Sequence, residues 1–221
     1  MSTRPRTIGY TVAPIAWGAK IDYDAWTDPW RDKTEYVGHY GGGGNTAGEI
    51  TGVWAEEAGE ILARPRAFRH PWLWWKWRQS QEYLAQLAKE RAVLRGWESY
   101  HLNKGWRGIA YNFAVGQSGT AYRLRGFNNN GAHYESDDID HDGISSNSES
   151  IAVVFILGVG QEPSLHAWRS FKKLRRTLGY RTGVWPTVYG HKEIAASGGH
   201  STACPGTPIM TRITRRWRTG S

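Results

Sequence analysis

A continuous apolar run, SIAVVFIL at Ser150–Leu157, limits the fold of this chain more than any other feature. The run has the length of a strand, and a strand without polar alternation is buried on both of its faces. Such a strand needs sheet neighbours on either side and covering layers above and below. The run therefore predicts the central strand of a sheet enclosed by helices.

Patterns on either side of this run supply the other elements. A helix is expected from Pro71 to about His101, where apolar residues recur at spacings of three, four and seven. A second helix is expected after Ser164, which suits an N-cap, with Gly179 as its stop. Further strands are expected at Thr34–His39, Ala110–Gly116, Thr120–Arg125 and Val184–Tyr189, the middle two forming a hairpin. The expected fold class is α/β, with a central mixed β-sheet flanked by helices.

Length and composition favour one domain. The chain has 221 residues, 39% of them hydrophobic, which is enough for a substantial core. A single domain over 1–221 is expected, with the basic end 214–221 as a tail. The thirteen tryptophans include a cluster in HPWLWWKWR, His70–Arg78, for which packing against Trp17, Trp26 and Trp30 is favoured over wall or membrane contact.

Charge and hydropathy bound the location and the partners. The formal net charge of +8 indicates a polyanionic partner, which leaves nucleic acid, an anionic membrane and an acidic cell-wall polymer open. No signal-peptide core stands near the N-terminus, and no run of about 18 apolar residues predicts a membrane span. A cytoplasmic protein that is released by something else is expected.

GHKEIAASGGHSTACPG, at Gly190–Gly206, holds two histidines and the only cysteine. A catalytic zinc site uses three nitrogen, sulfur or oxygen ligands and leaves one position open for water. His39 and His191 each stand at the end of an expected strand, and Cys204 is held by the turn that Pro205 begins. Spacing alone leaves two interpretations open, a metal site and a polar structural loop.

Several motifs in fixed order resemble one family. They are GWRGIAYNFAVGQSGTAYRLRGFNNNGAH at Gly105–His133, then SIAVVFILG, YGHKE and STACPG. Together they are similar to the type 2 N-acetylmuramoyl-L-alanine amidases, whose fold phage amidase endolysins share with peptidoglycan recognition proteins. The resemblance extends over 34–213, which leaves 1–33 as an N-terminal extension.

The resemblance implies roles for particular residues. His39, His191 and Cys204 would hold one Zn²⁺ ion, although Tyr40 stands where the family usually has a second histidine. Tyr111 would lie near the metal-bound water, and Thr202 would help to stabilise the tetrahedral intermediate. The loop before Cys204 is longer than in the family and contains His200, so His200 is an alternative ligand to His191. Substrate-binding positions are expected at His133, Arg125 and Asn130, whereas His101 is interpreted as an ordinary histidine.

An acidic segment, DIDHDGISSNSE at Asp138–Glu149, mimics a calcium-binding loop. Its carboxylates stand at relative positions 1, 3, 5 and 12 and Gly143 at position 6. Ser145 occupies the usual apolar position and a strand follows, so a solvated acidic loop is favoured. Calcium is the alternative, with the ligands Asp138, Asp140, Asp142 and Glu149.

The function implied is zinc-dependent hydrolysis of the amide between N-acetylmuramic acid and L-alanine in bacterial peptidoglycan. A monomeric phage endolysin is expected, held in the host cytoplasm until it is released to the wall. A non-catalytic peptidoglycan-binding module is the alternative, and retention of Cys204 argues against it. A nucleic-acid-binding protein is not expected, because it would explain neither the metal ligands nor the order of the motifs.

Overall fold

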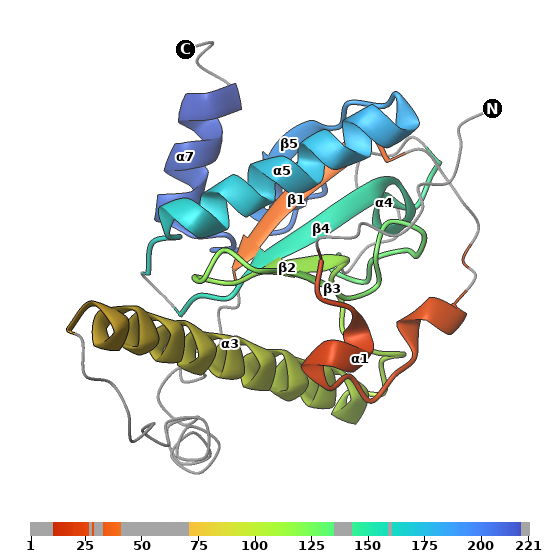
Figure 1. The fold of residues 1–221 in the computed structure, drawn as a ribbon. Coiled ribbons are helices and arrows are strands. Elements are labelled where there is room, and N and C mark those ends of the chain that lie inside the picture. Colours follow the sequence, from red (N-terminus) through yellow and green to blue (C-terminus); the bar gives the residue numbers. More distant parts are fainter. Residues whose placement is uncertain are drawn as a thin grey trace.

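The computed structural model describes residues 11–26, 28, 33–40, 71–134, 143–158 and 161–217. Its centre is a five-stranded sheet in the order β3-β2-β4-β1-β5 (Figure 1). β4 pairs in parallel with β1 and β2, β1 pairs in parallel with β5, and β2 and β3 form an antiparallel hairpin. The strands are β1 (Glu35–Tyr40), β2 (Phe113–Val115), β3 (Ala121–Arg123), β4 (Ser150–Phe155) and β5 (Thr187–Gly190).

The apolar run does form the central strand. Every residue of β4 is buried, and alternate side chains enter different halves of the core. Val153 packs with the residues of helix α5 (Leu165–Thr182), and Val154 packs with those of α3 (Pro71–Asn103). The predicted mixed sheet flanked by helices is therefore confirmed.

Helices cover both faces of the sheet. α3 lies along one face, whereas α5 and the C-terminal α7 (Thr207–Trp217) lie along the other (Figure 1). Shorter helical segments are α1 (Pro14–Trp17), η1 (Tyr23–Ala25), α4 (Ser146–Glu149) and α6 (His191–Ser197). Among the described residues no helix combines the length and the apolar character needed to span a bilayer.

The N-terminal end of α5 agrees with the sequence prediction, and its C-terminal end does not. Ser164 caps the helix as expected, because its hydroxyl accepts a hydrogen bond from the Ala167 N–H. Gly179, the expected stop, lies inside the helix, and the chain leaves it at Gly183, whose φ of 76° is the left-handed conformation that favours glycine. Gly179 serves packing instead, because a Cβ there would come within 2.5 Å of the Trp185 ring.

α3 has the predicted start and nearly the predicted end, but its apolar face is only partly buried. Leu94 and Trp97 are core residues, whereas Leu84 is exposed. The C-terminal half of the helix is covered by the N-terminal segment, in which Trp17 and Tyr23 are buried. Trp30 and the side chains of residues 70–78 lie outside the described part of the chain, as do 135–142 with Asp138, Asp140 and Asp142.

Glu98 on α3 holds the N-terminal segment in place. This buried carboxylate accepts hydrogen bonds from the Lys20 N–H at 2.7 Å, the Ile21 N–H at 3.4 Å and the Tyr23 hydroxyl at 2.9 Å. The Tyr23 oxygen accepts in turn from the Ile109 N–H at 2.8 Å, just before the hairpin. Glu98 therefore links residues about 80 positions away to the core.

Glu98→Ala is expected to lower the free energy of unfolding by about 2–4 kcal/mol, because buried donors lose a charged acceptor. Urea unfolding followed by circular dichroism measures this change. Glu82→Ala is the control, since Glu82 is an exposed carboxylate on the same helix, and a change of no more than about 0.5 kcal/mol is expected there. Equal effects of the two substitutions would contradict the role given to Glu98.

Candidate metal centre and groove

Three side chains with metal-binding atoms meet at one point. They are His39 near the end of β1, His191 at the start of α6 and Cys204 in the loop before α7, and their ligand atoms all lie within 4.8 Å of one another. His39 Nδ1 lies 3.5 Å from Cys204 Sγ. Nitrogen and sulfur ligands on a tetrahedral zinc ion are about 3.6 Å apart. The arrangement therefore fits zinc in both donor type and spacing.

Strand alternation explains the direction of His39. Val37 and His39 face the side of the sheet on which Tyr111 and α6 lie. Gly38 faces the opposite side, where its missing Cβ would stand 3.3 Å from Ile213 of α7. Glycine at this position lets α7 pack closely on the back of the strand that carries the candidate ligand.

The other two ligands are fixed relative to one another by backbone contacts. The Lys192 N–H donates to the Cys204 carbonyl oxygen at 2.8 Å, so the start of α6 is joined to the cysteine loop. The Glu193 side chain accepts from the Gly190 N–H at 2.7 Å, at the point where β5 becomes α6. His191 is thereby held at the end of the sheet. His200, the alternative ligand, is exposed and is not a member of the three-ligand cluster.

The protonation states of the two histidines also fit a metal site, whereas the cysteine would have to lose its proton to bind a metal ion. Burial lowers the pKa of His191 to about 4 and the pKa of His39 well below its usual value, so both imidazoles are neutral and keep a lone pair for a metal. Burial raises the pKa of the Cys204 thiol to about 12, and the Tyr40 N–H, which donates to the sulfur at 3.5 Å, acts in the opposite direction. Without a metal cation the thiol is therefore protonated.

His133 fixes the tautomer of His39. The Ser150 hydroxyl donates to the Ser146 carbonyl oxygen, so the Ser150 oxygen accepts from His133 Nε2–H at 2.9 Å. His133 Nδ1 then accepts from His39 Nε2–H, 3.1 Å away. The free lone pair of His39 is consequently on Nδ1, the nitrogen that faces Cys204. His133 thus acts as the outer partner of a candidate metal ligand.

His133→Phe is expected to weaken zinc binding about 10–100-fold, since loss of an outer hydrogen-bond partner has effects of this size. Phenylalanine has a ring of similar size but no acceptor for His39. Competition with a chromogenic chelator measures the affinity. His166→Phe, at an exposed histidine on α5, serves as the control. An unchanged affinity in His133→Phe would show that His39 is oriented without this hydrogen bond.

Tyr111 and Thr202 lie beside the three ligands. The Tyr111 ring is 5.1 Å from the His39 ring between centroids, and burial raises the pKa of its phenol, so the hydroxyl remains a donor at neutral pH. The Thr202 oxygen accepts from the Cys204 N–H at 3.2 Å, which leaves the hydroxyl hydrogen to point elsewhere. Both residues line the groove described next.

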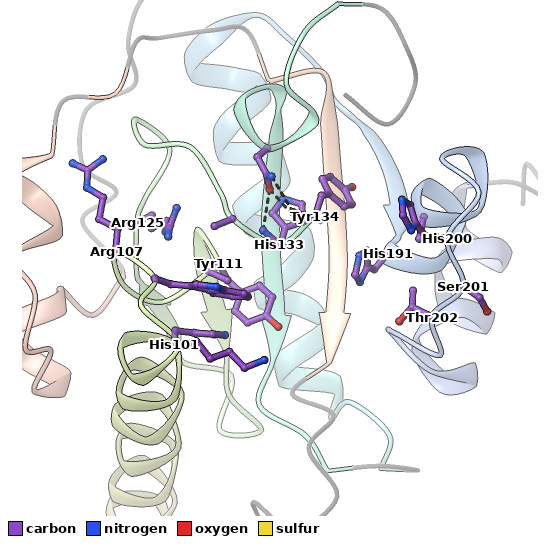
Figure 2. A pocket seen from close by; sticks show the side chains of 16 residues that line it. His101, Arg107, Tyr111, Arg125, His133, Tyr134, His191, His200, Ser201 and Thr202 are labelled. Carbon is purple, nitrogen blue, oxygen red and sulfur yellow. Dashed lines mark hydrogen bonds between the residues drawn. The ribbon is translucent and has the colours of Figure 1, made fainter. Parts of the chain in front are cut away.

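A groove of about 800 Å³ opens beside the centre. Figure 2 shows its lining in two groups, with His101, Arg107 and Tyr111 on one side and His191, His200 and Thr202 on the other. Among the lining residues that the structure describes, the cationic side chains are Lys104, Arg107 and Arg125, and none is a carboxylate. The described lining therefore favours a ligand that carries negative charge.

Of the three substrate-binding positions expected from the sequence, Arg125 and His133 line the groove and Asn130 does not. Arg125 lines the groove, and its guanidinium also donates to the Ile109 and Asn130 carbonyl oxygens. His133 lines the groove while bonding His39. Asn130 is not among the lining residues, and its N–H donates to Asp28 at 2.9 Å.

Sequence reasoning missed which residues form one wall of the groove. His101, interpreted as an ordinary histidine, stacks on Trp106 at 4.8 Å between ring centroids, and both rings line the groove with Lys104. The N-terminal segment contacts Arg107 through two residues. The centroid of the Trp26 ring lies 3.9 Å from the guanidinium carbon, and Asp28 forms a 3.0 Å ion pair with the same side chain. The cluster of aromatic and basic residues just before the tyrosine motif was the available signal.

The fold of this chain is similar to that of solved peptidoglycan recognition proteins. Drosophila PGRP-LB matches with a TM-score of 0.61 and 18% identity over 96% of this chain and 95% of that one. Peptidoglycan recognition protein-LE, in a complex with tracheal cytotoxin, a monomeric diaminopimelic acid-type peptidoglycan, matches with a TM-score of 0.60 and 17% identity over 94% of each chain. At this identity the likeness defines the fold, which is that of the peptidoglycan recognition proteins.

Sequence comparison then gives the family. The chain belongs to the N-acetylmuramoyl-L-alanine amidase family, whose model matches residues 73–207. Peptidoglycan-recognition protein SC1a of Drosophila melanogaster is 31% identical over 140 residues, which is 61% of this chain and 67% of that protein. Mouse peptidoglycan recognition protein 1 is 30% identical over 128 residues, or 56% and 62%. The family match includes Tyr111, His191 and Cys204 but begins after His39, so the fold alone brings His39 to the site.

The comparisons correct the expected location. A host cytoplasm was expected from the lack of a signal-peptide core near the N-terminus and from likeness to phage lysins, but the relatives identified are peptidoglycan recognition proteins of Drosophila and mouse. That location is therefore wrong for this chain.

Proposed function

We propose that this protein hydrolyses the amide bond between N-acetylmuramic acid and L-alanine in peptidoglycan, with a zinc ion held by His39, His191 and Cys204. The observation that carries the proposal is the convergence of these three ligands, within 4.8 Å, beside Tyr111 in the groove of an amidase-family fold. When bound, zinc supplies Lewis acidity and a water of lowered pKa.

The surrounding residues supply what an amide hydrolysis needs. The neutral phenol of Tyr111 donates a hydrogen bond to the carbonyl oxygen as negative charge develops on it, and the Thr202 hydroxyl is a second donor at the same edge of the groove. Positioned donors of this kind each contribute a few kcal/mol to transition-state stabilisation. His133 keeps the His39 lone pair directed at the centre.

The charge of the groove supports a peptidoglycan substrate. Stem peptides carry free carboxylates, and Lys104, Arg107 and Arg125 offer cations along one wall. The Trp106–His101 stack adds a flat aromatic surface against which the peptide or a sugar can lie.

Host lysis by a phage and a monomeric state stay predictions of the sequence.

A second candidate is peptidoglycan binding without hydrolysis. It is favoured by the similarity to peptidoglycan recognition protein-LE in complex with tracheal cytotoxin. The complete ligand set with Tyr111 favours hydrolysis, because binding alone needs neither a metal nor a donor at the centre.

The deciding experiment incubates the purified protein with peptidoglycan, with a chelator, and with the chelator followed by zinc. Mass spectrometry identifies the bond that is cut. Release of peptides with free L-alanine N-termini, lost with the chelator and restored by zinc, is the expected result. Stoichiometric zinc and peptidoglycan binding without any released peptide would overturn hydrolysis in favour of the binding module.

A further inference from the structure

The two helices on the face away from α3 carry an unusual concentration of positive charge. α5 and α7 contain no aspartate or glutamate. Their basic residues are Arg169, Lys172, Lys173, Arg175, Arg176 and Arg181 on α5 and Arg212, Arg215 and Arg216 on α7. Neither the metal centre nor the groove uses any of these residues.

The charges of the two helices form one surface. On α5, Arg169, Lys172 and Arg176 recur at spacings of three, four and seven, so they share one side of the helix. Partial burial lowers the pKa of Lys172, and the nearby cations of Arg216, Arg176 and Arg169 lower it further. Arg216 of α7 therefore lies near the α5 cations. We call Arg169, Lys172, Lys173, Arg176, Arg215 and Arg216 the α5–α7 basic surface.

Packing keeps the two helices in a fixed relation. Trp217 of α7 contacts Trp168 of α5 at 5.6 Å between ring centroids, and Arg212 lies 5.9 Å above the Trp168 ring. Ile213 is completely buried against the sheet. The basic surface is thus part of a rigid layer, and its repulsive charges are held together by the core beneath them.

Two exposed aromatic rings stand at one end of this surface. Tyr180 is 79% exposed and Trp185 is 49% exposed, and their rings meet edge to face at 5.1 Å. Tyr180 follows Arg176 by one helical turn, so it continues the line of cations. Amphipathic aromatic side chains beside lysine and arginine are typical of surfaces that lie in the headgroup region of a membrane.

The basic surface faces away from the groove. α5 and α7 lie on one side of the sheet and α3 on the other (Figure 1), and His39 points to the α3 side. A partner on the basic surface would therefore leave the groove open on the opposite side. The two sites can be occupied together.

We propose that the α5–α7 basic surface docks the protein on an anionic lipid bilayer. The cations spread over two packed helices, so they match an area of negative charge better than a single linear polyanion, which follows one row of cations. Tyr180 and Trp185 enter the headgroup region at the edge of the contact. Binding is electrostatic in the main and weakens as salt is added.

The test is sedimentation with vesicles of 30% phosphatidylglycerol in phosphatidylcholine. The expected result is binding at about 0.1 M salt, loss of most binding at about 0.5 M salt, and none to pure phosphatidylcholine. The combined variant Arg169→Glu, Arg176→Glu, Arg216→Glu should weaken binding by about 100-fold or more, since each cation near such a surface contributes about a factor of five. Cleavage of a soluble peptidoglycan fragment should be unchanged.

Matched variants separate the surface from net charge. Arg176→Glu and Lys89→Glu change the charge equally, but Lys89 is an exposed residue of α3 on the other face, so only Arg176→Glu should weaken vesicle binding. Replacing Arg169, Arg176 and Arg216 by lysine should preserve vesicle binding. Equal effects of the two single variants, or unchanged binding in the triple glutamate variant, would overturn the proposal. So would binding to polyphosphate or duplex DNA without binding to the anionic vesicles.

Discussion

Cys204→Ser is expected to abolish amide hydrolysis and to lower zinc affinity on the order of 10²–10³-fold, the share of one ligand in a typical zinc-binding free energy. The serine hydroxyl is a poor zinc ligand at neutral pH, and it is shorter than the thiol that now lies 3.5 Å from His39 Nδ1. Zinc content after dialysis and the release of L-alanine N-termini measure the two effects.

The two histidines of the same segment provide the control. His191→Ala should reproduce the loss of zinc, whereas His200→Ala should retain the metal, because His200 is exposed and stands outside the three-ligand cluster. A Cys204→Ser protein that keeps stoichiometric zinc and full activity would refute the ligand assignment. Loss of zinc in His200→Ala, with His191→Ala unaffected, would exchange the roles of the two histidines.

Tyr111→Phe is expected to lower kcat about 10²–10³-fold while zinc content stays the same. The ring itself is retained, so packing against His39 and Trp97 is preserved, and only the hydroxyl is lost. A donor that acts on the developing oxyanion changes kcat, whereas a donor that binds the substrate changes KM. Steady-state kinetics on a soluble peptidoglycan fragment separate these effects.

Thr202→Val and Thr202→Ser give the companion measurement for the second donor. Valine has the shape of threonine without its hydroxyl, and serine keeps the hydroxyl that accepts from the Cys204 N–H. Activity should fall in the valine variant and be largely kept in the serine variant. If Tyr111→Phe retained full kcat, stabilisation of the oxyanion would have to come from other groups.

Local sequence patterns predicted the elements whose causes are local. The apolar run became the central strand and Ser164 capped α5, because burial on both faces and N-capping are read directly from neighbouring residues. The end of α5 was predicted wrongly because Gly179 does not end the helix. Glycine is needed there to make room for the Trp185 ring, which a local pattern does not show. Leu84 is exposed for a related reason, since helical periodicity does not tell which part of a long helix another segment will cover.

In the candidate site, too, local motifs predicted some features and contacts between distant residues determine the others. Family motifs named His39, His191 and Cys204, and the structure brings these residues together; their role as zinc ligands stays a proposal. The contact between His133 and His39 joins positions 94 residues apart, and no motif states which nitrogen it fixes. The position of Arg107 in the groove wall depends on Trp26 and Asp28 of the N-terminal segment, about 80 residues earlier in the chain, and no local pattern predicts these contacts.

The contact between His39 and Cys204 joins positions 165 residues apart in a chain that has a single cysteine and therefore no internal disulfide. An ion shared by them would close a loop of most of the chain, and its removal would return conformational freedom to the segments on both sides. Such a cross-link opens to a chelating agent and withstands a reducing agent. The proposed metal centre would thus also stabilise the fold, and it would do so under reducing conditions in which a disulfide does not persist.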